Sequence, residues 1–152
     1  MRLGAGLGVG QASVAGRHES QAGFAGSLSI GAAGRRFEFD FETALQPFHT
    51  SNPVADEGFK AVYLLPSVRY HGDHAYVRVG IGYARFFWSG PAANVSSDGG
   101  LALSAALGYE FAKLRSFPLS LEAYWRGGTP DFEISCGIAG VQLVASWYAK
   151  KR

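Results

Sequence analysis

His49 and Ser51 have the residue types and spacing that come closest to a catalytic pair. A histidine can activate a serine two residues away when both face one side of a strand, and a nearby acid such as Glu57 can orient the ring. In this chain His49-Thr50-Ser51-Asn52 precedes Pro53 in a polar connection. Because a four-residue motif without its structural context is weak evidence of catalysis, we favour a solvated loop and expect no enzyme activity.

Two further places hold residues that could bind a metal or react. His71-Gly72-Asp73-His74 offers two imidazoles, but Gly-Asp between two strands is ordinary hairpin chemistry and no third ligand is near in the sequence. Cys136 is the only cysteine and lies in an apolar run, which is typical of a small buried side chain. We therefore expect no metal site and no cofactor.

The composition narrows the class of protein. The chain has 152 residues, a net charge of +2, 47% hydrophobic residues and only 17% charged ones. It is too apolar for a disordered chain and too mildly basic for a nucleic-acid partner, and it has no apolar run long enough for a transmembrane helix. We expect one domain over residues 1–152.

Alternation with period two runs along the whole chain. The apolar residues occupy odd-numbered positions, Leu3, Ala5, Leu7 and Val9, and glycines occupy the even-numbered ones. Residues of one parity, odd or even, share one face of a strand, so this pattern predicts a strand with two different faces. Seven more runs follow, around residues 24–31, 37–45, 62–70, 77–84, 101–111, 119–126 and 133–148. The parity changes near Gly140, where we expect a β-bulge, and we expect another at Pro66 because proline lacks a ladder donor.

The connections alternate in length, and both long ones, 46–58 and 88–100, fall at the same end of the sheet. We expect the connection between the first and second strands at residues 16–21. Short turns at one end and longer loops at the other are typical of bacterial barrels, in which the long loops are external. The expected fold is all-β, an eight-stranded antiparallel up-and-down transmembrane β-barrel.

Parity alone does not distinguish this barrel from a soluble, lipocalin-like ligand-binding barrel. The residue types do, because the non-apolar face consists mainly of Gly, Ala and Ser with a minority of charges. Small residues suit the crowded bore of an eight-stranded barrel, so the large apolar side chains must point outward into lipid.

Charged residues on the inward parity are expected to form a network that plugs the bore. Buried charges are tolerable only when paired, so we expect Arg69 and Arg78 near Glu38 and Glu110, and Glu42 near Lys60 and Arg126. The full expected network is Glu38, Asp40, Glu42, Lys60, Arg69, Arg78, Glu110, Glu122 and Arg126.

Arg85 falls on the outward parity. An Arg facing lipid costs about 2–4 kcal/mol at the bilayer centre but only about 0–1 near the interface, so Arg85 should lie near the external rim. The long-loop connections hold mostly acids, Glu19, Asp56, Glu57, Asp98 and Asp131 against Arg17. This balance argues against an external basic cluster for lipopolysaccharide phosphates.

The alternating runs, the pairs Gly82-Tyr83 and Gly108-Tyr109, and the loop pattern resemble the small eight-stranded bacterial outer-membrane barrel proteins over essentially the whole length. That resemblance implies a bacterial outer-membrane location, contact with outer-membrane lipids and a monomer, with external loops for contact or membrane integrity. The chain differs from that pattern at its end, which lacks a terminal aromatic residue, and residues 1–15 read as the first strand and not as a signal peptide.

His49-Thr50-Ser51-Asn52 is similar to the His-x-Ser-Asn of outer-membrane lipid A deacylases. In those enzymes the motif belongs to a strand near the C-terminal end, whereas five strands follow it here. A lipid-modifying barrel enzyme is therefore the alternative to a non-enzymatic barrel.

Overall fold

Nine strands make up the regular structure of a computed structural model that describes the whole chain except residues 15–16, 50–57, 90–93, 115–116, 132–133 and 149–152. They are β1 (Arg2–Val14), β2 (Arg17–Ala33), β3 (Phe37–His49), β4 (Gly58–His71), β5 (Ala75–Ser89), β6 (Asn94–Ser96), β7 (Gly100–Leu114), β8 (Phe117–Asp131) and β9 (Ile134–Ser146). None of the described residues belongs to a helix that could cross a membrane.

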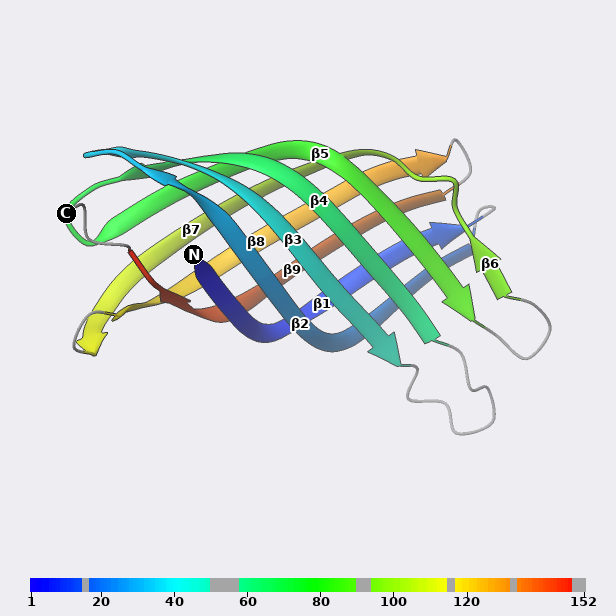
Figure 1. Cartoon of the computed structure of the whole chain (residues 1–152). Helices are drawn as coiled ribbons and strands as arrows, with labels where there is room; N and C mark the ends of the chain where they lie inside the picture. Colours follow the sequence, from blue (N-terminus) through cyan, green and yellow to red (C-terminus); the bar gives the residue numbers. More distant parts are fainter. Residues whose placement is uncertain (15–16, 50–57, 90–93, 115–116, 132–133, 149–152) are drawn as a thin grey trace.

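Eight of these strands close into an antiparallel barrel. Each long strand pairs with its neighbours in sequence, β5 pairs with β7, and β1 pairs with β9 from Arg2↔Ser146 to Val14↔Ile134 (Figure 1). The three-residue β6 adds only to the end of β5, beyond the β5–β7 ladder. Closure removes the free edges of the sheet, and the expected fold class is confirmed.

The two faces of the barrel differ as the alternation predicts. Large apolar side chains cover the outside and remain exposed, Phe39, Ile81 and Leu107 among them at 62, 58 and 64%. The inside holds small, aromatic and charged side chains. A soluble barrel would place polar residues on this exterior, so the surface favours lipid as the surrounding medium.

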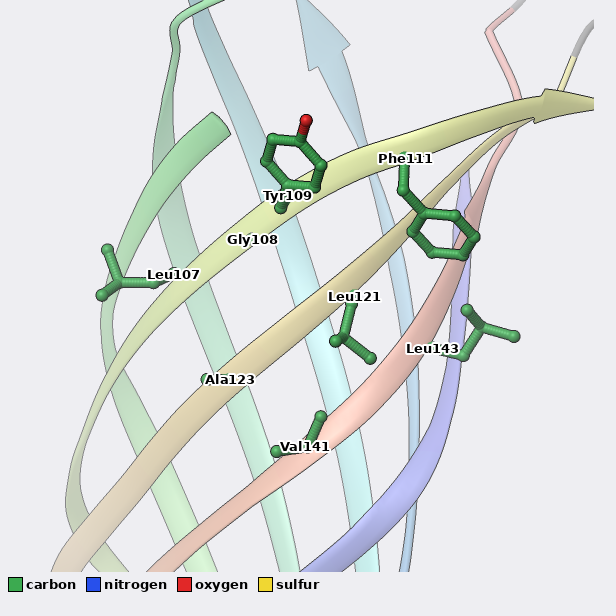
Figure 2. A pocket seen from close by; sticks show the side chains of 8 residues that line it. All are labelled: Leu107, Gly108, Tyr109, Phe111, Leu121, Ala123, Val141 and Leu143. Carbon is green, nitrogen blue, oxygen red and sulfur yellow. The ribbon is translucent and has the colours of Figure 1, made fainter. Parts of the chain in front are cut away.

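Aromatic side chains mark the short-turn end of the exterior. Phe37 and Tyr70 pack together with ring centroids 5.2 Å apart, and Phe117 and Trp147 pack at the same distance. An apolar depression lies on the outer face of β7, β8 and β9, where Tyr109 and Phe111 of β7 line it together with aliphatic side chains of β8 and β9 (Figure 2). It is part of the surface that meets lipid chains.

The expected positions of the irregularities were wrong. The β1–β9 register continues through Gly8↔Gly140, because Cys136 and Ile138 face the interior together with Gln142 and no residue is inserted. The parity change that suggested a bulge there arises because these two inward positions are apolar.

Pro66 does not form a bulge either. It pairs with Phe41 in an unbroken β3–β4 register, and the β4–β5 ladder resumes in the same register beyond it, at Ser67↔Gly80. The register shifts lie instead between Glu110 and Ala112 on β7 and between Gly128 and Asp131 on β8.

The strands at the long-loop end extend further than expected. β2 begins at Arg17, inside the connection expected at 16–21, and β1 continues to Val14. Beyond the β5–β7 ladder, Gly99 has a φ of 91°, a conformation that glycine adopts most easily.

Candidate functional site

The interior of the barrel is the candidate site, and it has two parts. Charged side chains fill the part toward the short turns, and apolar and aromatic side chains fill the part toward the long loops. Seven of the nine expected residues are buried in the charged part: Glu38, Asp40, Glu42, Arg69, Arg78, Glu122 and Arg126. Of the other two, Glu110 is half-buried at the turn end, and Lys60 is exposed.

One ion-pair cluster lies nearest the turns and is centred on Asp40 of β3. Arg2 and Ser67 both hydrogen-bond to its carboxylate, and Arg69 Nη2 lies 3.5 Å from it. Arg69 Nη1 also donates to Glu38 at 2.9 Å. Two strands on opposite sides of β3 in the barrel, β1 and β4, are thereby joined through one carboxylate.

His71 lies at the turn-end opening of this cluster. Its Nε2 lies 3.0 Å from Glu38 Oε2, and its Nδ1 lies 3.9 Å from Glu110 Oε1. Gly72, Asp73 and His74 form the turn between β4 and β5, where the Gly72 amide donates to the Ala75 carbonyl. Among the described residues, no group of His, Cys, Asp and Glu is arranged to hold a metal ion.

A second cluster crosses the middle of the bore. Arg78 of β5 hydrogen-bonds to Glu42 of β3 and donates to Glu122 of β8 at 2.8 Å. Arg126 donates to the other oxygen of Glu42 at 2.6 Å, and Gln142 donates to Glu122 at 2.5 Å. Since β3 and β8 stand four strands apart in the ring of eight, these bonds span the barrel and occupy its axis.

Tyr76 joins the two clusters. Its hydroxyl donates to Glu122 Oε2 at 3.0 Å, and the Arg69 guanidinium lies 4.4 Å from its ring centroid. The ring has room because Gly108 stands opposite: a Cβ there would lie 2.0 Å from Tyr76 Cζ. The glycine is thus required by the interior packing.

The charges of the bore balance. Among the described residues, four buried arginines, Arg2, Arg69, Arg78 and Arg126, face four buried carboxylates, Glu38, Asp40, Glu42 and Glu122. Taking single charges out of water is costly, whereas paired and hydrogen-bonded ones are tolerated. The buried charges of the described residues therefore compensate one another.

On the long-loop side of the charged network, apolar side chains fill the bore. Tyr63 and Phe86 meet edge to face with ring centroids 6.0 Å apart. Leu65, Ile138 and Cys136 are buried in the same cluster. An ion entering from the loops would therefore meet this apolar layer before the ion pairs.

Of the expected pairings, Arg69–Glu38 and Arg126–Glu42 are present, and the other four are not observed among the described residues. Arg78 binds Glu42 and Glu122 and not Glu38 or Glu110, while the one ion-pair contact of Glu110 within the described part of the chain is with His71. Lys60 is not near Glu42, because it falls on the outward parity of β4 beside buried Ala61. The alternation along β4 in the sequence already indicates that Lys60 faces outward.

Sequence reasoning also missed members of the network. Arg2 is absent from the expected network, yet it shares the inward parity of Gly4 and is 3% exposed. Gln142 and Tyr76 also lie on inward parities, but both are uncharged, and the expected network consisted of charged residues alone. His49 lies at the end of β3, where it pairs with Gly58 through the backbone, and Ser51 lies outside the described residues.

Comparisons with solved structures place this fold among small outer-membrane barrels. The attachment invasion locus protein Ail of Yersinia pestis matches with a TM-score of 0.66 and 14% identity, over 95% of each chain, and one of its crystal structures contains the heparin analogue sucrose octasulfate. Neisserial surface protein A matches with a TM-score of 0.62 and 13% identity, over 96% of each chain. The outer membrane enzyme PagL matches with a TM-score of 0.54 and 13% identity, over 95% of this chain and 98% of its own.

No protein-family model and no curated protein matches the sequence. The structural matches confirm the eight-stranded outer-membrane barrel fold, and the expected location, the bacterial outer membrane, is that of the proteins that share it. At 13–14% sequence identity, the similarity to these structures shows a shared fold and not a shared activity. The neighbours include an enzyme and surface proteins, so the fold does not choose between those activities.

Proposed function

We propose that this chain is a monomeric, non-enzymatic outer-membrane barrel that does not conduct ions, and that its external loops serve contact with the surroundings or its wall serves membrane integrity. The observation that carries the proposal is the filled bore. Four arginines and four carboxylates are paired across it, and the cluster containing Tyr63 and Phe86 closes its external part.

The carboxylates in the middle of the bore are already hydrogen-bonded to other side chains. Arg78 and Arg126 already bind Glu42, and Arg78 and Gln142 already bind Glu122, so a permeating cation would have to displace an arginine from each carboxylate. An eight-stranded barrel is only about wide enough for its own side chains. The same contacts that stabilise the barrel therefore exclude a water-filled path.

Planar-bilayer recording of the refolded protein tests this proposal. Folding and insertion are verified by heat-modifiable gel mobility of the same preparation, and a general porin serves as the positive control for the bilayer. We expect no steady current from the folded chain. Steady ohmic currents that scale with the amount of folded protein would contradict the sealed bore.

A further inference from the structure

Two cations face outward on neighbouring strands at the long-loop end of the barrel. Lys60 of β4 is exposed next to inward-facing Ala61, and Arg85 of β5 is exposed between inward-facing Ala84 and Phe86. The parities of both strands direct these side chains away from the bore. Neither belongs to the interior network.

The strand register brings the two cations together. Val62 stands opposite Arg85, and Lys60 stands opposite Phe87, so Lys60 and Arg85 are diagonal neighbours on one face of the sheet. Diagonal neighbours lie roughly 7–8 Å apart, which long side chains bridge easily. A single anion between them can contact both.

The pair lies where the long aliphatic run of the outer surface ends, and on β5 only the aromatic Phe87 follows it among the outward positions whose exposure is described. On β5 the outward positions run from Val77 through Val79 and Ile81 to Tyr83, and the next one is Arg85. On β4 they run from Tyr70 back to Val62, and the next one is Lys60. Such a run approaches the ~9–11 tilted residues that cross a hydrocarbon layer, so the two cations stand at the level of the lipid headgroups.

Contacts with Ser97, the residue after β6, and with Phe87 of β5 orient Arg85. Its Nε donates to the Ser97 carbonyl at 3.1 Å, and its guanidinium lies 5.3 Å from the Phe87 ring centroid. The adjacent Tyr83 hydroxyl donates to the Asp98 carbonyl at 2.6 Å. Among the described residues, no carboxylate forms an ion pair with Arg85 or Lys60.

The acidic long-loop connections argue against a basic cluster in the loops, but Lys60 and Arg85 lie on β4 and β5. We propose that these two residues bind the phosphate of a phosphorylated lipid headgroup in the leaflet at the long-loop side. A guanidinium offers paired donors to phosphate oxygens, and an ammonium adds a point charge. The Val62 side chain, which stands opposite Arg85 on the bilayer side of Lys60, would contact the acyl chains of the same lipid. A free phosphate would leave that apolar surface without a partner, which favours a lipid.

Native mass spectrometry of the detergent-refolded protein tests the site with three probes: bis-phosphorylated lipid A, the same lipid without its phosphates, and inorganic phosphate. We expect the phosphorylated lipid to be retained and the dephosphorylated lipid to bind more weakly. Lys60→Gln/Arg85→Gln should weaken retention of the phosphorylated lipid about tenfold or more, as the loss of charge-assisted hydrogen bonds implies.

Arg35→Gln/Arg36→Gln is the matched control, because it removes two exposed cations from the opposite end of the barrel. It should retain the lipid as the unchanged protein does. Equal retention by Lys60→Gln/Arg85→Gln would overturn the proposal, as would full competition by inorganic phosphate at the concentration of the lipid. If the double variant does not refold, Lys60→Gln alone, which leaves the Arg85–Ser97 bond intact, gives the same comparison.

This test is independent of the sealed bore. A conducting barrel could still bind the lipid, and a sealed one could fail to bind it. The two proposals are therefore separately falsifiable.

Discussion

Arg126 on β8 and Glu42 on β3 meet across the barrel, with Nη2 2.6 Å from Oε1, although 84 residues separate them in the sequence. Arg78 of β5 binds the second oxygen of the same carboxylate. Glu42 thus neutralises two buried cations that come from two other walls of the barrel. Its removal leaves both without their shared partner.

Glu42→Ala should therefore destabilise the barrel strongly. Breaking a buried pair by removing one partner costs about 3–5 kcal/mol, because the remaining charge stays buried. Urea unfolding in detergent micelles, followed by tryptophan fluorescence and heat-modifiable mobility, measures the loss. Glu110→Ala is the control: Glu110 is half-buried and its only ion-pair contact among the described residues is His71 at 3.9 Å, so its loss should cost less than about 1 kcal/mol. Equal costs for the two variants would contradict the role of Glu42 as the shared partner of Arg78 and Arg126.

The absence of enzyme activity is a separate prediction. Expression of the chain in a Gram-negative host should leave the acylation of lipid A and phospholipids unchanged, and His49→Ala should give the same lipid profile. Mass spectrometry of extracted lipids is the measurement. Loss of an acyl chain that requires both His49 and Ser51 would establish the lipid-modifying alternative.

Side-chain orientation was largely predictable from the sequence, because a strand has only two faces. The parity of Phe39, Ile81 and Leu103 indicates the exterior, and that of Glu38 and Arg78 the bore, as observed. The same alternation places Arg2 in the bore and Lys60 on the exterior, so both orientations were predictable from the sequence.

The partners within the bore were not predictable in the same way. Which residues meet across a barrel depends on closure and on the stagger between strands, and these follow from the whole set of strand registers. Arg78 reaches Glu42 and Glu122 because β3, β5 and β8 present those positions at one level. Charge sign alone allows many other pairings.

Cys136 gives a direct test of the bore, since it is the only cysteine in the chain. Its thiol is buried beside Tyr63 and Ile138 in the apolar cluster. A water-soluble maleimide should therefore label the denatured protein and leave the folded barrel unlabelled over the same time. Rapid labelling of the folded barrel would show that water reaches the apolar layer. Ile81→Cys in a Cys136→Ala background, which places a thiol on the lipid face, should react with a lipid-soluble reagent.

Gly108 of β7, the cross-strand partner of Tyr76, tests how tightly the charged network is packed. A Cβ at this position would lie 2.0 Å from Tyr76 Cζ, so Gly108→Ala must displace a ring whose hydroxyl donates to Glu122. Overpacking of this kind costs about 1–3 kcal/mol, measurable as a lower urea midpoint in micelles. Gly26→Ala is the matched control, because a Cβ at Gly26 meets nothing within 4 Å and should change stability little. Shortening the ring in Gly108→Ala/Tyr76→Ser should remove the clash but also the bond to Glu122, so the second substitution should cost less in the Gly108→Ala background than in the unchanged chain. Additive costs would show that the two side chains do not touch.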